Sequence, residues 1–111
     1  MGELSNDGGN KFDGEKLRVD LLPPIGITSI ADILTFGAKK YADNNWKKGI
    51  KFSRVYGALQ RHLLAWYGGE EFDHESGLPH LWHAACNLMF LTYYMNHYGK
   101  YVSFDDRGEM Q

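Results

Sequence analysis

Cysteine is almost absent from this sequence, and so are the short motifs by which many hydrolases are recognised. Its 111 residues contain one cysteine, Cys86, which excludes a cysteine-rich zinc site. No G-x-x-x-x-G-K or G-x-G-x-x-G segment occurs, so neither a P-loop nor a dinucleotide-binding turn is indicated. H-E-x-x-H is also missing, and Asp73-His74 reverses the histidine–aspartate doublet of one class of phosphohydrolases. Any metal or acid–base chemistry must therefore come from histidines and carboxylates spread along the chain.

A large net charge and long uninterrupted apolar runs are lacking as well. The formal net charge of -2 argues against a general nucleic-acid binder, so we expect no stable DNA or RNA binding. Histidines and asparagines interrupt the most apolar stretch, residues 79–98, which argues against a membrane span. The polar, glycine-rich start has no signal-peptide pattern, and a lone Cys86 in an apolar helix suits a reducing compartment. We therefore expect a cytoplasmic protein without a membrane partner.

Size and periodicity predict a single all-α domain. A hydrophobic fraction of 43% favours a packed core, and 111 residues suit one domain. Apolar residues recur at helical spacing in three segments. The expected helices run from Thr28 or Ser29 to about Tyr41, from Arg54 to about Tyr67 after a capping Ser53, and from Pro79 to Tyr98 before an exit at Gly99.

The ends of the chain are expected to differ from this bundle of three main helices. Residues 1–10 are predicted to be a flexible leader, residues 11–98 the helical domain, and residues 99–111 a polar tail anchored by Tyr101 and Phe104. Within the domain, Pro23-Pro24 should hold residues 11–24 as an extended N-terminal arm. Two interpretations of the arm stay open. Its leucines (Leu17, Leu21 and Leu22) pack on the domain, or its cations (Lys11, Lys16 and Arg18) meet phosphates.

The aromatic content exceeds what one small bundle needs. Aromatic residues make up 14% of the chain, and many of them fall in the second and third expected helices. A homodimer or higher homo-oligomer, in which the long helices pair, would bury this surplus.

The third expected helix carries a line of polar side chains through apolar surroundings. His80, His83 and Asn87 are three and four residues apart, which places them on one helical face. An acidic connector (Glu70, Glu71, Asp73 and Glu75) precedes this helix, and a basic span of residues 39–61 precedes the connector. This segregation predicts an anion site beside a cation site. The alternative is that the histidines form hydrogen bonds within the core or with the connector.

Four segments in this order resemble a known family. They are K-F-D-G-E-K-L-R-V-D-L-L-P-P, F-G-A-K-K-Y-A-D-N-N-W-K-K-G, R-V-Y-G-A-L-Q-R-H-L-L-A-W and S-G-L-P-H-L-W-H-A-A-C-N-L-M-F-L, within residues 11–98. The family consists of small, mostly phage proteins named for dATP/dGTP diphosphohydrolase, and it is similar to the MazG-like nucleotide pyrophosphohydrolases. The resemblance implies an all-α, MazG-like, oligomeric fold that hydrolyses a nucleoside triphosphate to monophosphate and pyrophosphate. Residues 11–98 would then be a nucleotide-binding domain.

The chain departs from the metal-binding pattern of the MazG-like enzymes. Those enzymes hold divalent metals with E-x-x-E on one helix and E-x-x-D on the next, whereas this chain has Arg61 and His62, then His80 and His83. Three explanations stay open: a softer metal, replacement of the missing ligands by Asp73 and neighbouring acids, or nucleotide binding without cleavage. Imidazoles combined with carboxylates suit manganese, iron, nickel or zinc.

The resemblance leads to a set of site residues and to two alternatives. The catalytic histidines would be His62, His80 and His83, and a divalent metal (manganese or magnesium, with zinc or nickel as alternatives) would be held by His80, His83 and Asp73. Phosphates would meet Lys11, Lys16, Arg18, Lys40 and Arg61, and the base or sugar would meet Asn45, Trp46 or Asn87. One alternative is a non-catalytic phage protein that sequesters a (cyclic) nucleotide signal of host defence, and the other is a helical module that binds an acidic protein.

Overall fold

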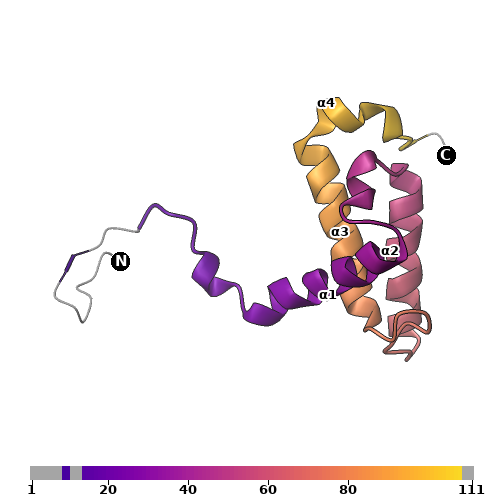
Figure 1. Cartoon of the computed structure of the whole chain (residues 1–111), viewed down its shortest axis with the longest axis horizontal. Helices are drawn as coiled ribbons and strands as arrows, with labels where there is room; N and C mark the ends of the chain where they lie inside the picture. Colours follow the sequence, from indigo (N-terminus) through magenta and orange to yellow (C-terminus); the bar gives the residue numbers. More distant parts are fainter. Residues whose placement is uncertain (1–8, 11–13, 109–111) are drawn as a thin grey trace.

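The computed structural model describes residues 9–10 and 14–108, and these form an all-α fold (Figure 1). Among them no strand occurs, and one isolated bridge joins Phe72 to Pro79. The predicted fold class is confirmed. The elements in order are η1 (Val19–Leu21), α1 (Pro24–Lys40), η2 (Asn45–Lys48), α2 (Phe52–Tyr67), α3 (His80–Asn96), α4 (Tyr98–Tyr101) and η3 (Val102–Phe104).

The body of the molecule is built on the pairing of α2 with α3. These helices run side by side in opposite directions, and α1 packs against α3 more sparsely (Figure 1). At one end, Phe52, Val55, Tyr94 and Tyr101 form a buried cluster against which Trp46 and Phe104 pack. Burying aromatic rings of this size contributes much of the stability of a small domain.

Two tyrosine hydroxyls connect this cluster to η2. The hydroxyl of Tyr94 donates to the carbonyl of Trp46 at 2.6 Å, and that of Tyr101 donates to the carbonyl of Lys47 at 2.7 Å. Gly49 follows η2 with a φ of 108°, and a Cβ there would lie 2.3 Å from a ring carbon of Phe104. Only glycine fits this position. The predicted anchors Tyr101 and Phe104 therefore hold the segment after α3 onto the core.

The first helix begins earlier than the sequence predicted. Instead of capping at Thr28 or Ser29, α1 starts at Pro24 with Pro23 as its N-cap. The expectation that the double proline stops regular structure was wrong. The fixed φ of proline suits a first helical turn. Backbone N–H groups in that turn form no intrahelical hydrogen bond, so the missing N–H of proline costs nothing there.

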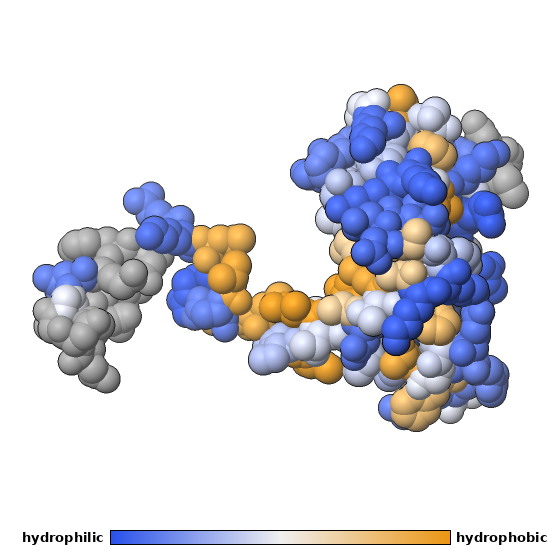
Figure 2. Space-filling view, in the orientation of Figure 1, coloured by the Kyte–Doolittle hydropathy of each residue, from blue (hydrophilic) through white to orange (hydrophobic). Residues whose placement is uncertain are grey.

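The described part of the arm, from residue 14 onward, lies away from the body (Figure 1), and this contradicts the interpretation in which its leucines pack on the domain. Leu17, Leu21 and Leu22 are exposed by 87%, 70% and 51%. Figure 2 shows apolar surface along this projecting segment and along the start of α1. Lys11 and most of the predicted leader, residues 1–8, lie outside the described residues.

Two other helix ends differ by a few residues from expectation. Lys51 rather than Ser53 is the N-cap of α2, and Ser53 instead binds Asp106 through its hydroxyl at 2.5 Å and its N–H at 2.9 Å. Helix α3 ends at Asn96 with His97 as its C-cap, whereas Gly99 lies within the short α4.

Candidate functional site

A cavity of about 430 Å³ lies between α1, η2, α2, the connector and α3. Side chains from all five segments line it, although they are spread over residues 33–90. Eight of the side chains predicted for the site are among them: Lys40, Asn45, Trp46, Arg61, His62, Asp73, His83 and Asn87. The structure therefore brings most of the predicted site residues to one place.

The connector between α2 and α3 is folded by its own hydrogen bonds. The N–H of Asp73 donates to the carbonyl of Leu78 at 2.8 Å, and the N–H of His80 donates to the carbonyl of Glu71 at 2.8 Å. The Asp73 carboxylate accepts the N–H groups of Glu75 and Ser76 at 3.1 and 2.9 Å. An aspartate that binds the backbone ahead of it in this way stabilises a turn. The turn fixes the position of Asp73 beside the histidines of the site.

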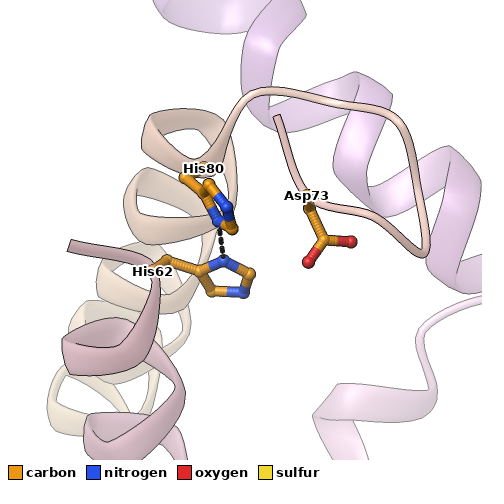
Figure 3. Close-up of side chains that lie close together, drawn as sticks. All are labelled: His62, Asp73 and His80. Atoms are coloured by element: carbon orange, nitrogen blue, oxygen red, sulfur yellow. Dashed lines mark hydrogen bonds between the residues drawn. The ribbon is translucent and has the colours of Figure 1, made fainter. Parts of the chain in front are cut away.

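Two histidines from different helices meet beside Asp73 (Figure 3). The Nδ1 atoms of His62 on α2 and His80 on α3 are 2.9 Å apart, within hydrogen-bond distance. Nitrogen or oxygen atoms of His62, Asp73 and His80 lie within 4.8 Å of one another, close enough to share a metal ion. On its other side, Nε2 of His80 lies 2.5 Å from a carboxylate oxygen of Glu70.

His83 belongs to the same region but has different contacts. Its ring stacks on His62 with centroids 4.5 Å apart and planes 7° from parallel. Its Nε2 lies 2.7 Å from the hydroxyl of Ser76 and 3.9 Å from Asp73 Oδ2. The compact donor set thus contains His62 where the sequence interpretation placed His83.

The surroundings favour the neutral forms of His62 and His83 and the ionised forms of Glu70 and Asp73. Burial lowers the pKa of His62, with a further contribution from the neighbouring His83, and burial also lowers the pKa of His83. The hydrogen bond from His80 lowers the pKa of Glu70. For Asp73, burial acts to raise the pKa, but hydrogen bonds from Ser76 and the nearby His83 outweigh it and the pKa is lowered. Neutral imidazoles and ionised carboxylates are the forms that bind metals.

Two of the predicted phosphate-binding cations reach the cavity. Lys40 at the end of α1 and Arg61 on α2 line it. Lys40 is held by a hydrogen-bonded ion pair with Glu75 of the connector. Lys16 and Arg18 lie on the exposed arm, where Arg18 pairs with Asp20 at 2.7 Å. Within this one chain, Lys16 and Arg18, the two arm cations that the structure describes, do not line the cavity.

The residues predicted to meet the base or sugar are partly committed to the fold. The Trp46 ring stacks on Phe90 at 4.7 Å and meets Tyr93 edge-on at 4.9 Å, so it anchors η2 to α3. The Asn87 side chain donates its Nδ2 to the carbonyl of His83 within α3 at 2.9 Å, which leaves its amide oxygen.

Sequence reasoning did not single out Glu70, Ser76 or Glu75 as separate site residues. Each of them contacts a predicted site residue: Glu70 contacts His80, Ser76 contacts His83, and Glu75 contacts Lys40. The signal available was their place in a short acidic connector just before α3. Among the described residues, no helix is long and apolar enough to cross a membrane.

Comparison with known proteins gives one family. The family model described as "dATP/dGTP diphosphohydrolase, N-terminal" matches residues 6–107. A relative named "dATP/dGTP diphosphohydrolase", from Salmonella phage PMBT28, is 38% identical over 88 residues. Those residues are 79% of this chain, which spans about 30% of the length of that relative. No solved structure matches the chain. Since the family model covers nearly the whole sequence, the chain belongs to the dATP/dGTP diphosphohydrolase N-terminal family.

Proposed function

We propose that this chain is part of a nucleotide diphosphohydrolase that converts purine (deoxy)nucleoside triphosphates to monophosphate and pyrophosphate in the host-cell cytoplasm. The observation that carries the proposal is the cavity, which is lined by two cations and by members of a histidine–aspartate cluster. Lys40 and Arg61 would neutralise phosphate oxygens through charge-assisted hydrogen bonds. The family name and the name of the phage relative support the same reaction class.

The cluster of His62, Asp73 and His80 fits a divalent cation. It offers imidazole nitrogens and a carboxylate, the donor set that suits manganese, iron, nickel or zinc better than magnesium. Manganese is the cation that we favour, with zinc or nickel as alternatives. A bound cation would polarise a phosphoryl oxygen and stabilise the charge that develops on it.

The surrounding residues would keep this cluster and the substrate in place. Ser76 orients His83 through the contact at Nε2, and the stacked rings of His83 and His62 restrict each other. Asn45 and the amide oxygen of Asn87 are available at the cavity for the base or sugar. The volume of about 430 Å³ is in the range of small-ligand pockets.

Sequestration of a nucleotide is the second candidate. It is favoured by one observation: Arg61 and Lys40 line the cavity and can donate to phosphate oxygens without any metal. Such a site would retain a (cyclic) nucleotide signal of host defence and return it intact.

Incubation with purified nucleotides tests both candidates. The purified chain is mixed with each dNTP and NTP and with manganese or magnesium, and the products are separated by chromatography. Hydrolysis predicts release of pyrophosphate that is lost in His62→Ala, His80→Ala and His83→Ala. The control is His97→Ala, at the exposed end of α3. Intact nucleotide that co-elutes with the protein would reject hydrolysis and favour sequestration, whereas neither product nor binding would reject both.

A further inference from the structure

Glu70 begins a chain of hydrogen bonds that leads from the surface to the cavity. Its carboxylate contacts Nε2 of His80 at 2.5 Å, and Nδ1 of His80 contacts Nδ1 of His62 at 2.9 Å. His80 is buried, with 5% of its surface exposed, and it does not line the cavity, whereas His62 does. The buried ring of His80 therefore connects an exposed acid to a histidine at the cavity.

When His80 is neutral, the chemistry of the three groups determines where the protons lie. An ionised carboxylate only accepts hydrogen bonds, so Nε2 of His80 must donate to Glu70. In neutral His80 the other nitrogen, Nδ1, is then an acceptor, and the proton between the two rings belongs to Nδ1 of His62. A neutral His62 with its proton on Nδ1 leaves Nε2 unprotonated. Figure 3 shows this second nitrogen of His62 outside the hydrogen bond between the rings, with Asp73 beside the pair.

The surroundings of His62 maintain this arrangement. The ring is held on one face by the parallel ring of His83 at 4.5 Å, which limits its rotation. His80 is fixed in turn by its backbone N–H, which donates to the carbonyl of Glu71 at 2.8 Å.

We propose that Glu70 is a positioning residue that keeps a proton on Nε2 of His80 and thereby fixes His62 as the Nδ1–H tautomer. The unprotonated Nε2 of His62 is then the nitrogen that binds a divalent cation beside Asp73. This inference rests on the metal-binding part of the proposed function. It revises the donor set given above: His62 and Asp73 bind the cation, whereas both ring nitrogens of His80 are committed to Glu70 and His62, so His80 acts through His62. Outer-shell partners that orient a metal-binding histidine typically change metal affinity by about 10–100-fold when they are removed.

Imidazole NMR and zinc titration test this assignment in the full chain. Zinc is the probe because it is diamagnetic and accepts histidine nitrogen readily. Long-range ¹H–¹⁵N spectra of histidine-labelled protein report which ring nitrogen carries the proton, first without metal and then with Zn²⁺. Calorimetry gives the zinc affinity of the wild type, Glu70→Ala and Glu70→Gln. The matched control is Glu71→Ala, which removes the neighbouring carboxylate but keeps the backbone carbonyl that binds His80.

The expected result has three parts. Metal-free wild type shows His80 protonated at Nε2 and His62 at Nδ1, and zinc perturbs Nε2 of His62 while the proton stays on Nδ1. Glu70→Ala mixes the tautomers of both rings and weakens zinc binding by about 10-fold or more. Glu70→Gln is intermediate, because the amide oxygen still accepts a hydrogen bond, and Glu71→Ala behaves as the wild type.

Several results would overturn the assignment. They are His62 protonated at Nε2 in the metal-free wild type, transfer of its proton to Nε2 when zinc binds, no zinc binding at all, or Glu70→Ala indistinguishable from Glu71→Ala. Pyrophosphate release measured on the same samples separates this inference from the proposed function. Glu70-dependent tautomers and zinc affinity without hydrolysis would reject the hydrolase and retain the role of Glu70. Hydrolysis in samples where Glu70→Ala leaves the tautomers of His62 and His80 unchanged would retain the hydrolase and reject the role of Glu70.

Discussion

Lys40 shows how one side chain at the cavity is occupied before any ligand arrives. Its ammonium pairs with Glu75, and both side chains are largely exposed, with 39% and 62% of their surface accessible. An exposed pair of this kind adds little to stability, because solvent screens the two charges. A phosphate entering the cavity must compete with Glu75 for the same ammonium group.

Removing that competitor should strengthen nucleotide binding. We expect Glu75→Gln to lower the Kd for nucleotide several-fold with little change in the free energy of unfolding. Lys40→Gln should raise the Kd about tenfold, because it removes a charge-assisted hydrogen bond to the phosphate. Calorimetric titration gives both values, with Lys39→Gln as the control for charge on the same helical turn. A higher Kd in Glu75→Gln would show that the Glu75 carboxylate supports ligand binding instead.

The two cavity histidines predict how stability depends on pH. Burial lowers the pKa of His62 and His83 in the folded protein below the usual value near 6.5. The unfolded chain therefore binds more protons than the folded chain as the pH falls from about 7 through these lowered pKa values. We expect the urea midpoint to decrease between pH 7.5 and 5.5, and His62→Gln combined with His83→Gln to reduce that decrease. His97→Gln, on the exposed end of α3, serves as the control. An equal decrease in the double variant would contradict the assignment.

The residues of the site were predictable where the helical period placed them on one face. The spacing of His80, His83 and Asn87 predicted a polar line within an apolar helix, and His80 is indeed buried on that side of α3. The sequence could not show that His62 faces His80, because that contact depends on the register between α2 and α3. Nor could it show that Glu70 turns back to His80, since the path of the connector depends on its own backbone hydrogen bonds.

At the scale of elements, the helices differ in how well the sequence defined them. Helix α2 was expected from residue 54 to about residue 67 and is observed as Phe52–Tyr67, because its apolar stripe is regular and Gly68-Gly69 follows it. Helix α1 was shortened in the prediction because Pro23-Pro24 was interpreted as a break. A proline pair is compatible with either an extended arm or a first helical turn, and local sequence does not decide between them.

The contact between η2 and the segment after α3 gives a stability prediction. The Tyr101 ring is 1% exposed and its hydroxyl binds the Lys47 carbonyl. Tyr101→Ala should lower the free energy of unfolding by about 3–5 kcal/mol, since it leaves a cavity and an unpaired carbonyl. Tyr67→Ala, at a side chain that is 85% exposed, should change it by less than about 0.5 kcal/mol. Urea denaturation followed by circular dichroism measures both, and similar losses in the two variants would show that the C-terminal turn is not part of the cooperative core.

At the scale of the whole molecule, the shape is more extended than that of a compact domain of this length. The radius of gyration is 18.2 Å, whereas about 13 Å is typical of a compact domain of 100 residues. The projecting arm and the start of α1 account for this difference (Figure 1), and they carry apolar side chains that contact little of their own body. We propose that a second copy of the chain covers this surface, in agreement with the oligomer that the aromatic content predicts.

Removing the apolar surface of the arm should therefore dissociate the assembly without unfolding the body. Leu17, Leu21 and Ile25 are exposed by 87%, 70% and 54%, so their replacement by serine together leaves the core intact. Light scattering coupled to gel filtration should give an oligomeric mass for the wild type and a monomeric mass for the triple variant, with equal helical content by circular dichroism. Leu64→Ser, at a site 68% exposed on α2, is the control for loss of surface leucine elsewhere. A wild type that remains monomeric as its concentration is raised would contradict the proposal. The apolar surface of the arm would then be expected to bind a partner other than a second copy, because exposing such a surface to water is unfavourable.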